Sequence, residues 1–143
     1  MKQLYTEIEI NAPAEQVWQI LTDFDSFPDW NPFVRRAAGT IEPGQPLEIE
    51  LSGPGGRTTK IKPNVVTAEP NREFSWLGIM GMKGLFDGKH IFTIEPLDEN
   101  RVRFIQREEF NGILASLVLG MIGRSTEQSF VKMNQALKEK AEQ

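Results

Sequence analysis

The residues best suited to acid–base chemistry are Glu108 and His90, the single histidine of the chain. Both lie in stretches whose residues alternate between two faces, as they do in β-strands. In 101–110, one face carries Val102, Phe104, Gln106, Glu108 and Phe110. In 86–96, we take the face with His90, Phe92 and Ile94 as inward. We therefore expect His90, Gln106 and Glu108 to lie within side-chain reach of one another among aromatic rings.

An inward carboxylate beside the histidine has three interpretations. The polar groups could satisfy one another's hydrogen bonds in the interior. They could instead orient the polar group of a ligand, or Glu108 and His90 could act as a general acid and base. Neither a nucleophile nor a set of metal ligands accompanies them, so the structural interpretation is favoured and catalysis is favoured least.

The composition excludes several kinds of site. The 143 residues include no cysteine and one histidine, which excludes thiol nucleophiles, iron–sulfur clusters, Cys-ligated zinc and multi-histidine metal sites. We therefore expect no metal and no cofactor. The sequence pI is about 5.1, and the basic residues are scattered, so nucleic acid is not an expected partner.

The chain length bears on the number of domains, and the apolar segments bear on secretion and membrane insertion. A chain of this size can bury a sizeable core, and we expect one domain over residues 1–143. Its first residues alternate polar and apolar without the apolar centre of a secretory signal, so we expect the mature protein to begin at Met1. The longest apolar stretch, 113–122, is shorter than the roughly 20 residues that span a bilayer. We expect a cytoplasmic protein without stable membrane insertion.

Three kinds of element follow one another along the chain. Alternation up to Ile10 predicts a first strand, and Pro13 begins a short helix that ends near Thr22. A further helical turn over 23–27 leads into an aromatic-rich loop over 27–33. Turn residues then separate six predicted strands near 34–39, 46–52, 58–68, 72–79, 86–96 and 101–110. Apolar residues spaced by three and four predict a terminal helix over 113–140, about 40 Å long.

These elements predict an α+β fold. A curved seven-stranded antiparallel sheet must cover one face, and the terminal helix is the only element long enough to cover it. Two short helices connect the first and second strands. One stripe of helix side chains cannot fill the concave face of such a sheet, so we expect a cavity between them.

Three segments resemble the START-like (SRPBCC) superfamily. They are 10–18 (INAPAEQVW), the FPDWNPF loop at 27–33, and the strand 103–112 (RFIQREEFNG) that precedes a long helix. The resemblance covers the whole chain and implies the helix-grip fold, shared by lipid-transfer domains and aromatic polyketide cyclases. It implies a hydrophobic ligand cavity between the sheet and the terminal helix. The superfamily shares no single catalytic set, so no catalytic residue is assigned from the resemblance.

The alternation and the helix stripe together predict the residues of this cavity. Phe74 and Trp76 are the inward pair of their strand. The expected lining is Trp76, Phe74, His90, Phe92, Phe104, Gln106, Glu108, Ile122, Thr126 and Phe130.

Two loops could form the mouth of the cavity. Met80 and Met82 lie among glycines, and Trp30 and Phe33 lie among prolines. Packing in the core is the first interpretation of both loops, and a rim or lid is the second.

The first half of the terminal helix, 113–122, is apolar nearly all round. Loops could cover its outer side, which is the favoured interpretation. A second copy of the chain in a homodimer and a membrane surface are the alternatives.

Together these observations favour a noncatalytic protein that binds or transports a small hydrophobic or amphipathic molecule, lipid-like or resembling an aromatic polyketide. One alternative is a cavity enzyme of the cyclase, dehydratase or isomerase type, with Glu108 and His90 as acid and base. Another is a protein-interaction module.

Overall fold

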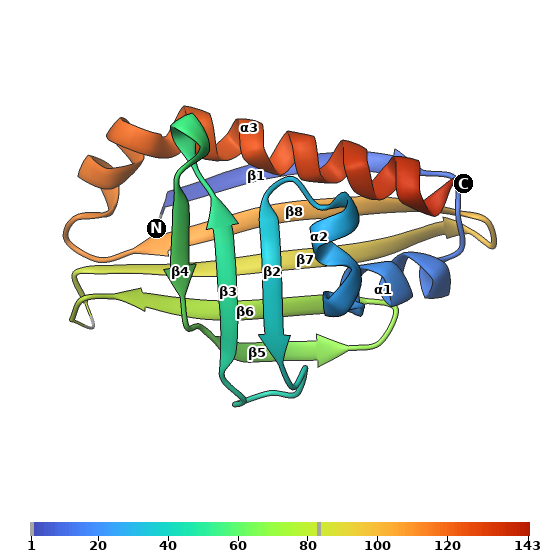
Figure 1. Ribbon diagram of the computed structural model, residues 1–143, viewed down its shortest axis with the longest axis horizontal. Helices are drawn as coiled ribbons and strands as arrows, with labels where there is room; N and C mark the ends of the chain where they lie inside the picture. The colour runs from blue at the N-terminus through green and yellow to red at the C-terminus, as the bar shows by residue number, and fades with distance from the viewer. Residues whose placement is uncertain (1, 83) are drawn as a thin grey trace.

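A five-stranded antiparallel sheet runs the length of the molecule (Figure 1). The computed structural model describes residues 2–82 and 84–143, without the side chains of Pro54 and Met80. The strands of this sheet, in spatial order, are β1 (Lys2–Ile10), β8 (Arg101–Asn111), β7 (Phe86–Asp98), β6 (Glu73–Met80) and β5 (Asn64–Glu69). Each neighbouring pair is antiparallel.

A second, three-stranded sheet lies across one face of the first. Its strands are β2 (Val34–Gly39), β3 (Leu47–Ser52) and β4 (Thr58–Ile61), in that order. In Figure 1 they run across the direction of the large sheet. The short helical turn η2 (Pro54–Gly56) connects β3 to β4.

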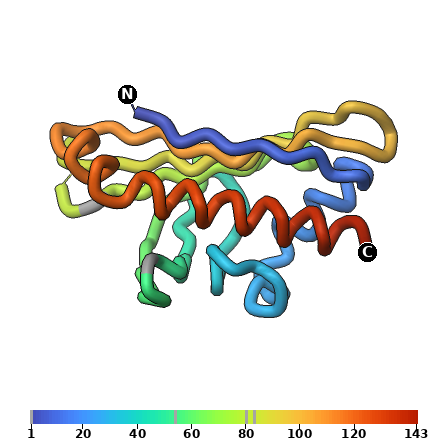
Figure 2. The backbone as a smooth tube through the Cα atoms, turned by 90° about the horizontal axis from the view of Figure 1, so that it is seen from above, coloured from blue at the N-terminus to red at the C-terminus, as the bar shows by residue number. Residues whose placement is uncertain are grey.

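Helices cover the same face of the large sheet as the small one does. Figure 2 shows the long helix α3 (Ala115–Ala141) along the sheet, with the three-stranded sheet on the same side. The connection from β1 to β2 contains α1 (Ala14–Thr22), the 3₁₀ turn η1 (Phe24–Ser26) and α2 (Phe27–Trp30). None of the helices in the described part of the chain is long and apolar enough to cross a membrane.

The sequence-based prediction of one seven-stranded sheet is wrong. Residues 2–82 and 84–143 form eight strands in two sheets, because the stretch expected as one strand over 58–68 is divided into β4 and β5. Pro63 lies at the division, and proline has no N–H to donate to a strand ladder. The chain therefore leaves the small sheet at this point and enters the large one.

Local backbone chemistry also moves two predicted boundaries. Residues 27–30, expected in a loop, form α2 with Pro28 in its first turn, where a missing N–H is tolerated. Helix α3 begins two residues later than predicted. The N–H groups of Ile113 and Leu114 donate instead to the carbonyl oxygens of Gly84 and Leu85.

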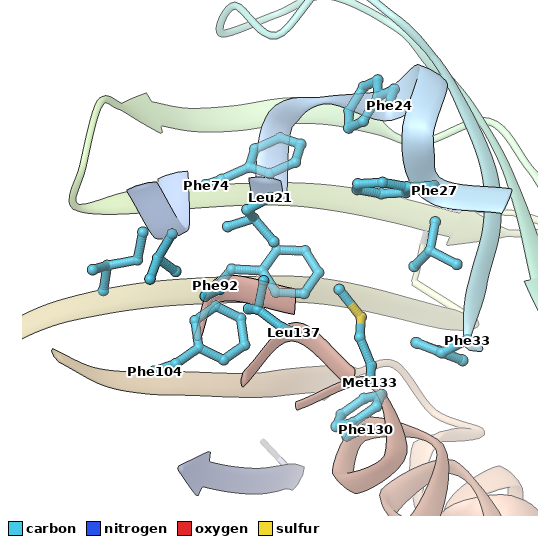
Figure 3. Close-up of a cluster of buried hydrophobic side chains, with 14 of the residues drawn as sticks. Leu21, Phe24, Phe27, Phe33, Phe74, Phe92, Phe104, Phe130, Met133 and Leu137 are labelled. Atoms are coloured by element: carbon cyan, nitrogen blue, oxygen red, sulfur yellow. The ribbon is translucent and has the colours of Figure 1, made fainter. Parts of the chain in front are cut away.

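The hydrophobic core lies between the large sheet and the second half of α3 (Figure 3). Phe74, Phe92 and Phe104 come from neighbouring strands and are fully buried. Phe130, Met133 and Leu137 meet them from α3, and Leu21 joins from α1. Aromatic rings therefore fill the middle and the C-terminal end of the space under the helix.

Candidate functional site

A cavity of about 470 Å³ lies between the two sheets and the first half of α3. This volume is within the roughly 300–1,000 Å³ usual for small-molecule sites. Its residues are Phe33, Leu51, Ser52, Gly53, Thr59, Lys60, Ile61, Lys62, Trp76, Gly78, Ile79, Gly81, Phe86, Gly88, His90, Glu108, Phe110, Ile122, Ser125, Thr126 and Ser129. Lys60, Ile79 and Ile122 are exposed, so the cavity reaches the surface between β4, β6 and α3.

Three cavity residues form one row across the large sheet. Trp76 is the cross-strand partner of His90, and His90 is the partner of Glu108. The Trp76 and His90 rings stack with their centroids 5.0 Å apart, and Phe130 meets the imidazole edge-on at 4.9 Å. Opposite strand residues share a face of a sheet, so this row presents an indole, an imidazole and a carboxylate to one cavity.

A chain of hydrogen bonds connects this row to β1 and α3. The Thr6 hydroxyl donates to the backbone carbonyl of Gln106 (2.7 Å) and accepts from Asn134 Nδ2 (2.9 Å). Gln106 Nε2 donates to Asn134 Oδ1 (2.7 Å). Gln106 Oε1 then lies 2.9 Å from His90 Nε2. Thr6, Gln106, Asn134 and His90 are all buried, so the chain satisfies polar groups that would otherwise be costly inside the protein.

The order of donors and acceptors in these hydrogen bonds determines that His90 Nε2 carries a hydrogen. A backbone carbonyl only accepts, so the Thr6 proton is committed to Gln106 and the amide groups of Asn134 and Gln106 can be orientated in only one way. Gln106 consequently presents an oxygen to His90, and Nε2 must carry the hydrogen. The other nitrogen, Nδ1, lies 3.6 Å from Glu108 Oε1, so a proton on Nδ1 would lie between ring and carboxylate.

A glycine makes room for the Glu108 carboxylate. A Cβ atom built at Gly88 would lie 2.5 Å from Glu108 Oε2, closer than real contacts allow. The His90 side chain is 3% exposed and that of Glu108 is 18% exposed, so the carboxylate is the part of the pair that the cavity reaches more readily. Glu108 can therefore accept a hydrogen bond from a molecule in the cavity while it faces His90.

The structure brings together part of the predicted lining. Trp76, His90, Glu108, Ile122 and Thr126 surround the cavity. Five other predicted residues lie outside its lining and are buried in the packed interior, namely Phe74, Phe92, Phe104, Gln106 and Phe130. The reason is the position of the cavity, which lies toward the N-terminal end of α3, beyond the aromatic cluster of the core.

Of the residues expected at the mouth of the cavity, some line it and others do not. Phe33 lines the cavity, whereas Trp30 does not, because it packs edge-on against Phe27 with ring centroids 5.4 Å apart. Met82 is exposed and does not line the cavity. The Met80 side chain lies outside the described part of the structure. Ile79 and Gly81 of the same hairpin are lining residues.

Sequence reasoning missed the contribution of the small sheet and of two serines. Leu51, Thr59 and Ile61 lie on β3 and β4, which the sequence placed in one continuous sheet. Ser125 and Ser129 line the cavity from α3. Ser125 follows Ile122 by three residues and Ser129 follows Ser125 by four, so all three lie on one side of the helix, and that spacing was the available signal.

A family described as polyketide cyclase / dehydrase and lipid transport matches residues 1–142. The chain belongs to this family. The match confirms the START-like (SRPBCC) resemblance of the sequence. No curated protein sequence matches the chain.

Several solved structures share the fold at low identity. The Zhui aromatase/cyclase from Streptomyces sp. R1128 has a TM-score of 0.79 at 16% identity, covering 99% of this chain and 93% of that one. A START superfamily protein from Mycobacterium smegmatis has a TM-score of 0.71 at 18% identity, covering 98% and 97%. Norcoclaurine synthase from Thalictrum flavum, solved with dopamine and hydroxybenzaldehyde, has a TM-score of 0.70 at 15% identity, covering 96% and 84%. At these identities the likeness concerns the fold alone.

Proposed function

We propose that this family member binds a small, largely apolar molecule that carries a polar group, and that the cavity of about 470 Å³ is its binding site. The observation that carries the proposal is the row of Trp76, His90 and Glu108 on the cavity face of the sheet. A flat apolar body would stack on the indole and pack against Phe33 and Phe110. The carboxylate would accept a hydrogen bond from its polar group.

The buried hydrogen-bond chain supports binding without catalysis as the leading function. His90 Nε2 is committed to Gln106, so the imidazole is held in place rather than left free to exchange protons at both nitrogens. Binding or transport needs no more than a shaped, pre-formed cavity.

A cavity enzyme of the cyclase, dehydratase or isomerase type is the second candidate. The observation that favours it is the 3.6 Å separation of His90 Nδ1 and Glu108 Oε1 beside the cavity. In that function one of these two residues would act as the general base that takes a proton from the substrate. The other would act as the general acid that gives a proton back to it. The Zhui protein and norcoclaurine synthase are named as enzymes and share this fold.

Filling the cavity tests the binding proposal. Thr126 lines it from α3, and Thr126→Trp should fill it without removing a core side chain. The matched control is Glu127→Trp, because Glu127 is exposed and does not line the cavity. With 2-naphthol as the probe in isothermal titration calorimetry, we expect Thr126→Trp to abolish binding and Glu127→Trp to retain it. Equal binding by both variants, or none by the wild type, would overturn the proposal.

Glu108→Gln separates the two candidate functions from a structural role. If Glu108 orients the ligand, we expect the affinity for a bound molecule to fall about tenfold with little loss of melting temperature. A variant that keeps its ligand and loses turnover would favour the enzyme. Loss of stability with unchanged affinity would remove Glu108 from the site. Native mass spectrometry of protein purified from its own host would supply the natural ligand for these assays.

A further inference from the structure

A second cavity, of about 280 Å³, lies between the β3–β4 turn and the middle of α3. Its residues are Pro32, Ser52, Gly53, Gly55, Gly56, Ser125, Gln128, Ser129 and Lys132. Side chains with hydroxyl, amide and ammonium groups come from α3, and the turn contributes mostly glycines. This cavity is therefore polar, in contrast to the aromatic lining of the first.

The two cavities are neighbours that share part of their lining. Ser52, Gly53, Ser125 and Ser129 line both of them. Ser125 and Ser129 donate their hydroxyl protons to helix carbonyls one turn earlier, so their small side chains lie flat against α3. A molecule seated on Trp76 can therefore extend along α3, past the serines, toward Lys132.

Lysine residues line both cavities. Lys60 and Lys62 line the first cavity, and Lys132 lines the second. Within the described residues, none of these three ammonium groups has a carboxylate within 4.0 Å, and Glu108 is the only carboxylate that lines either cavity. The chain as a whole has a net charge of −4. Lys62 and Lys132 are thus cationic groups without an acidic partner in a molecule of net negative charge, whereas Lys60 lies opposite Glu50 in the small sheet.

Lys132 is placed to pair with an anion at the polar end of the path. Gln128, one turn earlier on α3, offers an amide N–H group on the same side. Neither side chain donates a hydrogen bond to another described residue. Both donors are thus free for a group in the second cavity.

We propose that the second cavity binds a carboxylate of an amphipathic ligand whose apolar body occupies the first cavity, with Lys132 as the counter-ion. This inference rests on the proposed function and defines its ligand class as an organic acid with an apolar body. Glu108 and Lys132 then receive opposite ends of one molecule: Glu108 accepts a hydrogen bond, and Lys132 neutralises a negative charge.

A charge reversal with three matched probes tests the assignment. Dodecanoate, dodecan-1-ol and dodecylamine share one apolar chain and differ in the charge of the end group. In Lys132→Glu we expect the affinity for dodecanoate to fall about tenfold, that for dodecylamine to rise, and that for dodecan-1-ol to stay unchanged. Added salt should weaken dodecanoate binding in the wild type, because Lys132 is exposed and its charge is screened.

Lys140→Glu is the control for the general effect of charge. Lys140 is exposed on the same helix about 12 Å further along and lines neither cavity. Equal responses of Lys132→Glu and Lys140→Glu, or an equal loss of dodecanoate and dodecan-1-ol, would overturn the carboxylate assignment while leaving the cavity as a binding site. Failure of all three probes and of 2-naphthol to bind the wild type would overturn both proposals.

Discussion

The two halves of α3 do different things in one continuous helix. From Phe130 onward, Phe130, Met133 and Leu137 are fully buried against the large sheet. Before Gly123, Leu117 is 63% exposed and Met121 is 77% exposed, although these residues are just as apolar. Loops therefore do not cover the outer side of the first half, contrary to the interpretation favoured from the sequence.

The difference shows that apolar character alone does not say whether a helix segment packs. The second half meets a layer of aromatic rings that fills the space down to the sheet (Figure 3). The first half has the cavity beneath it and solvent above it. The second half of the helix is thus packed on the sheet, whereas the first half lies over a cavity.

The largest difference is expected between side-chain truncations in the two halves of α3, measured as the change in unfolding free energy. We expect Phe130→Ala to cost roughly 3–5 kcal/mol of unfolding free energy, because a buried ring is replaced by a cavity. Met121→Ala should change it by less than about 0.5 kcal/mol, since its side chain is mostly in water. Urea denaturation followed by far-UV circular dichroism measures both.

Similar costs at the two positions would contradict this comparison. They would indicate that Met121 is covered in solution, as it would be in a homodimer. The homodimer, which the sequence offered as an alternative for the apolar stretch, stays a prediction, and sedimentation velocity over a range of protein concentrations tests it.

Asn134 lies in the packed half, where its amide bridges Gln106 and Thr6. We expect Asn134→Leu to lower the free energy of unfolding by about 1–3 kcal/mol, because the buried Gln106 amide and the buried Thr6 hydroxyl each lose one hydrogen-bond partner. Gln135→Leu is the matched control, since Gln135 is an exposed neighbour. A cost no larger than that of the control would show that the chain of hydrogen bonds contributes little.

NMR of the His90 imidazole tests the same chain of hydrogen bonds. It is the only histidine, so its imidazole ¹⁵N signals need no further assignment. We expect the wild type to show a protonated Nε2, as the orientation of Gln106 requires, and Asn134→Leu to change that pattern. An Nδ1-protonated, Nε2-free ring in the wild type would contradict the direction inferred for the chain.

The alternation of residues in strands was enough to place His90, Gln106 and Glu108 on one face of the large sheet. Period 2 is a rigid property of a strand, so these assignments do not depend on the rest of the fold. The long terminal helix was predictable for the same reason, from its period near 3.6.

Other features depend on long-range packing. The transfer of the chain between sheets at Pro63 brings β3 and β4 over the cavity, and no periodicity encodes which sheet a strand joins. Phe92 and Phe104 do face inward, yet they are covered by α3 side chains rather than by open space. Which part of a concave face remains empty is decided by the volumes of side chains that meet from distant segments.

A glycine substitution sharpens the comparison at the cavity end. Gly88→Ala should displace the Glu108 carboxylate, because the new methyl group would occupy its position. Gly78→Ala is the matched control: its Cβ would meet only ordinary contacts, at 3.9 Å from the Gly88 carbonyl oxygen and 4.0 Å from Pro63 Cβ. We expect Gly88→Ala alone to shift the His90 ring signals, with a stability change of less than about 1 kcal/mol. The comparison is made on these ring signals, because Gly78 also lines the cavity. Equal effects of both variants would show that Gly88 does not position Glu108.

The smallest effect is expected at the far end of the packed half, where Glu142 joins the end of α3 to the end of β1. The Asn11 backbone N–H donates to Glu142 Oε2 at 2.8 Å, and Lys138 donates to the same oxygen. The Asn11 hydrogen bond, followed by that of Lys138, lowers the pKa of Glu142 below its ordinary value of 4.5. A lowered pKa in the folded state means that the carboxylate stabilises the fold at neutral pH, and that this contribution is lost as the pH falls from about 4.5 through the lower folded value.

We therefore expect Glu142→Gln to be slightly less stable than the wild type at neutral pH, with the difference vanishing in acid and shrinking in high salt. Glu127→Gln, exposed in the middle of the same helix, is the control, and urea midpoints across the pH range are the measurement. A deficit of Glu142→Gln that persists in acid would show that the link depends on shape or neutral hydrogen bonding rather than on the charge of the carboxylate.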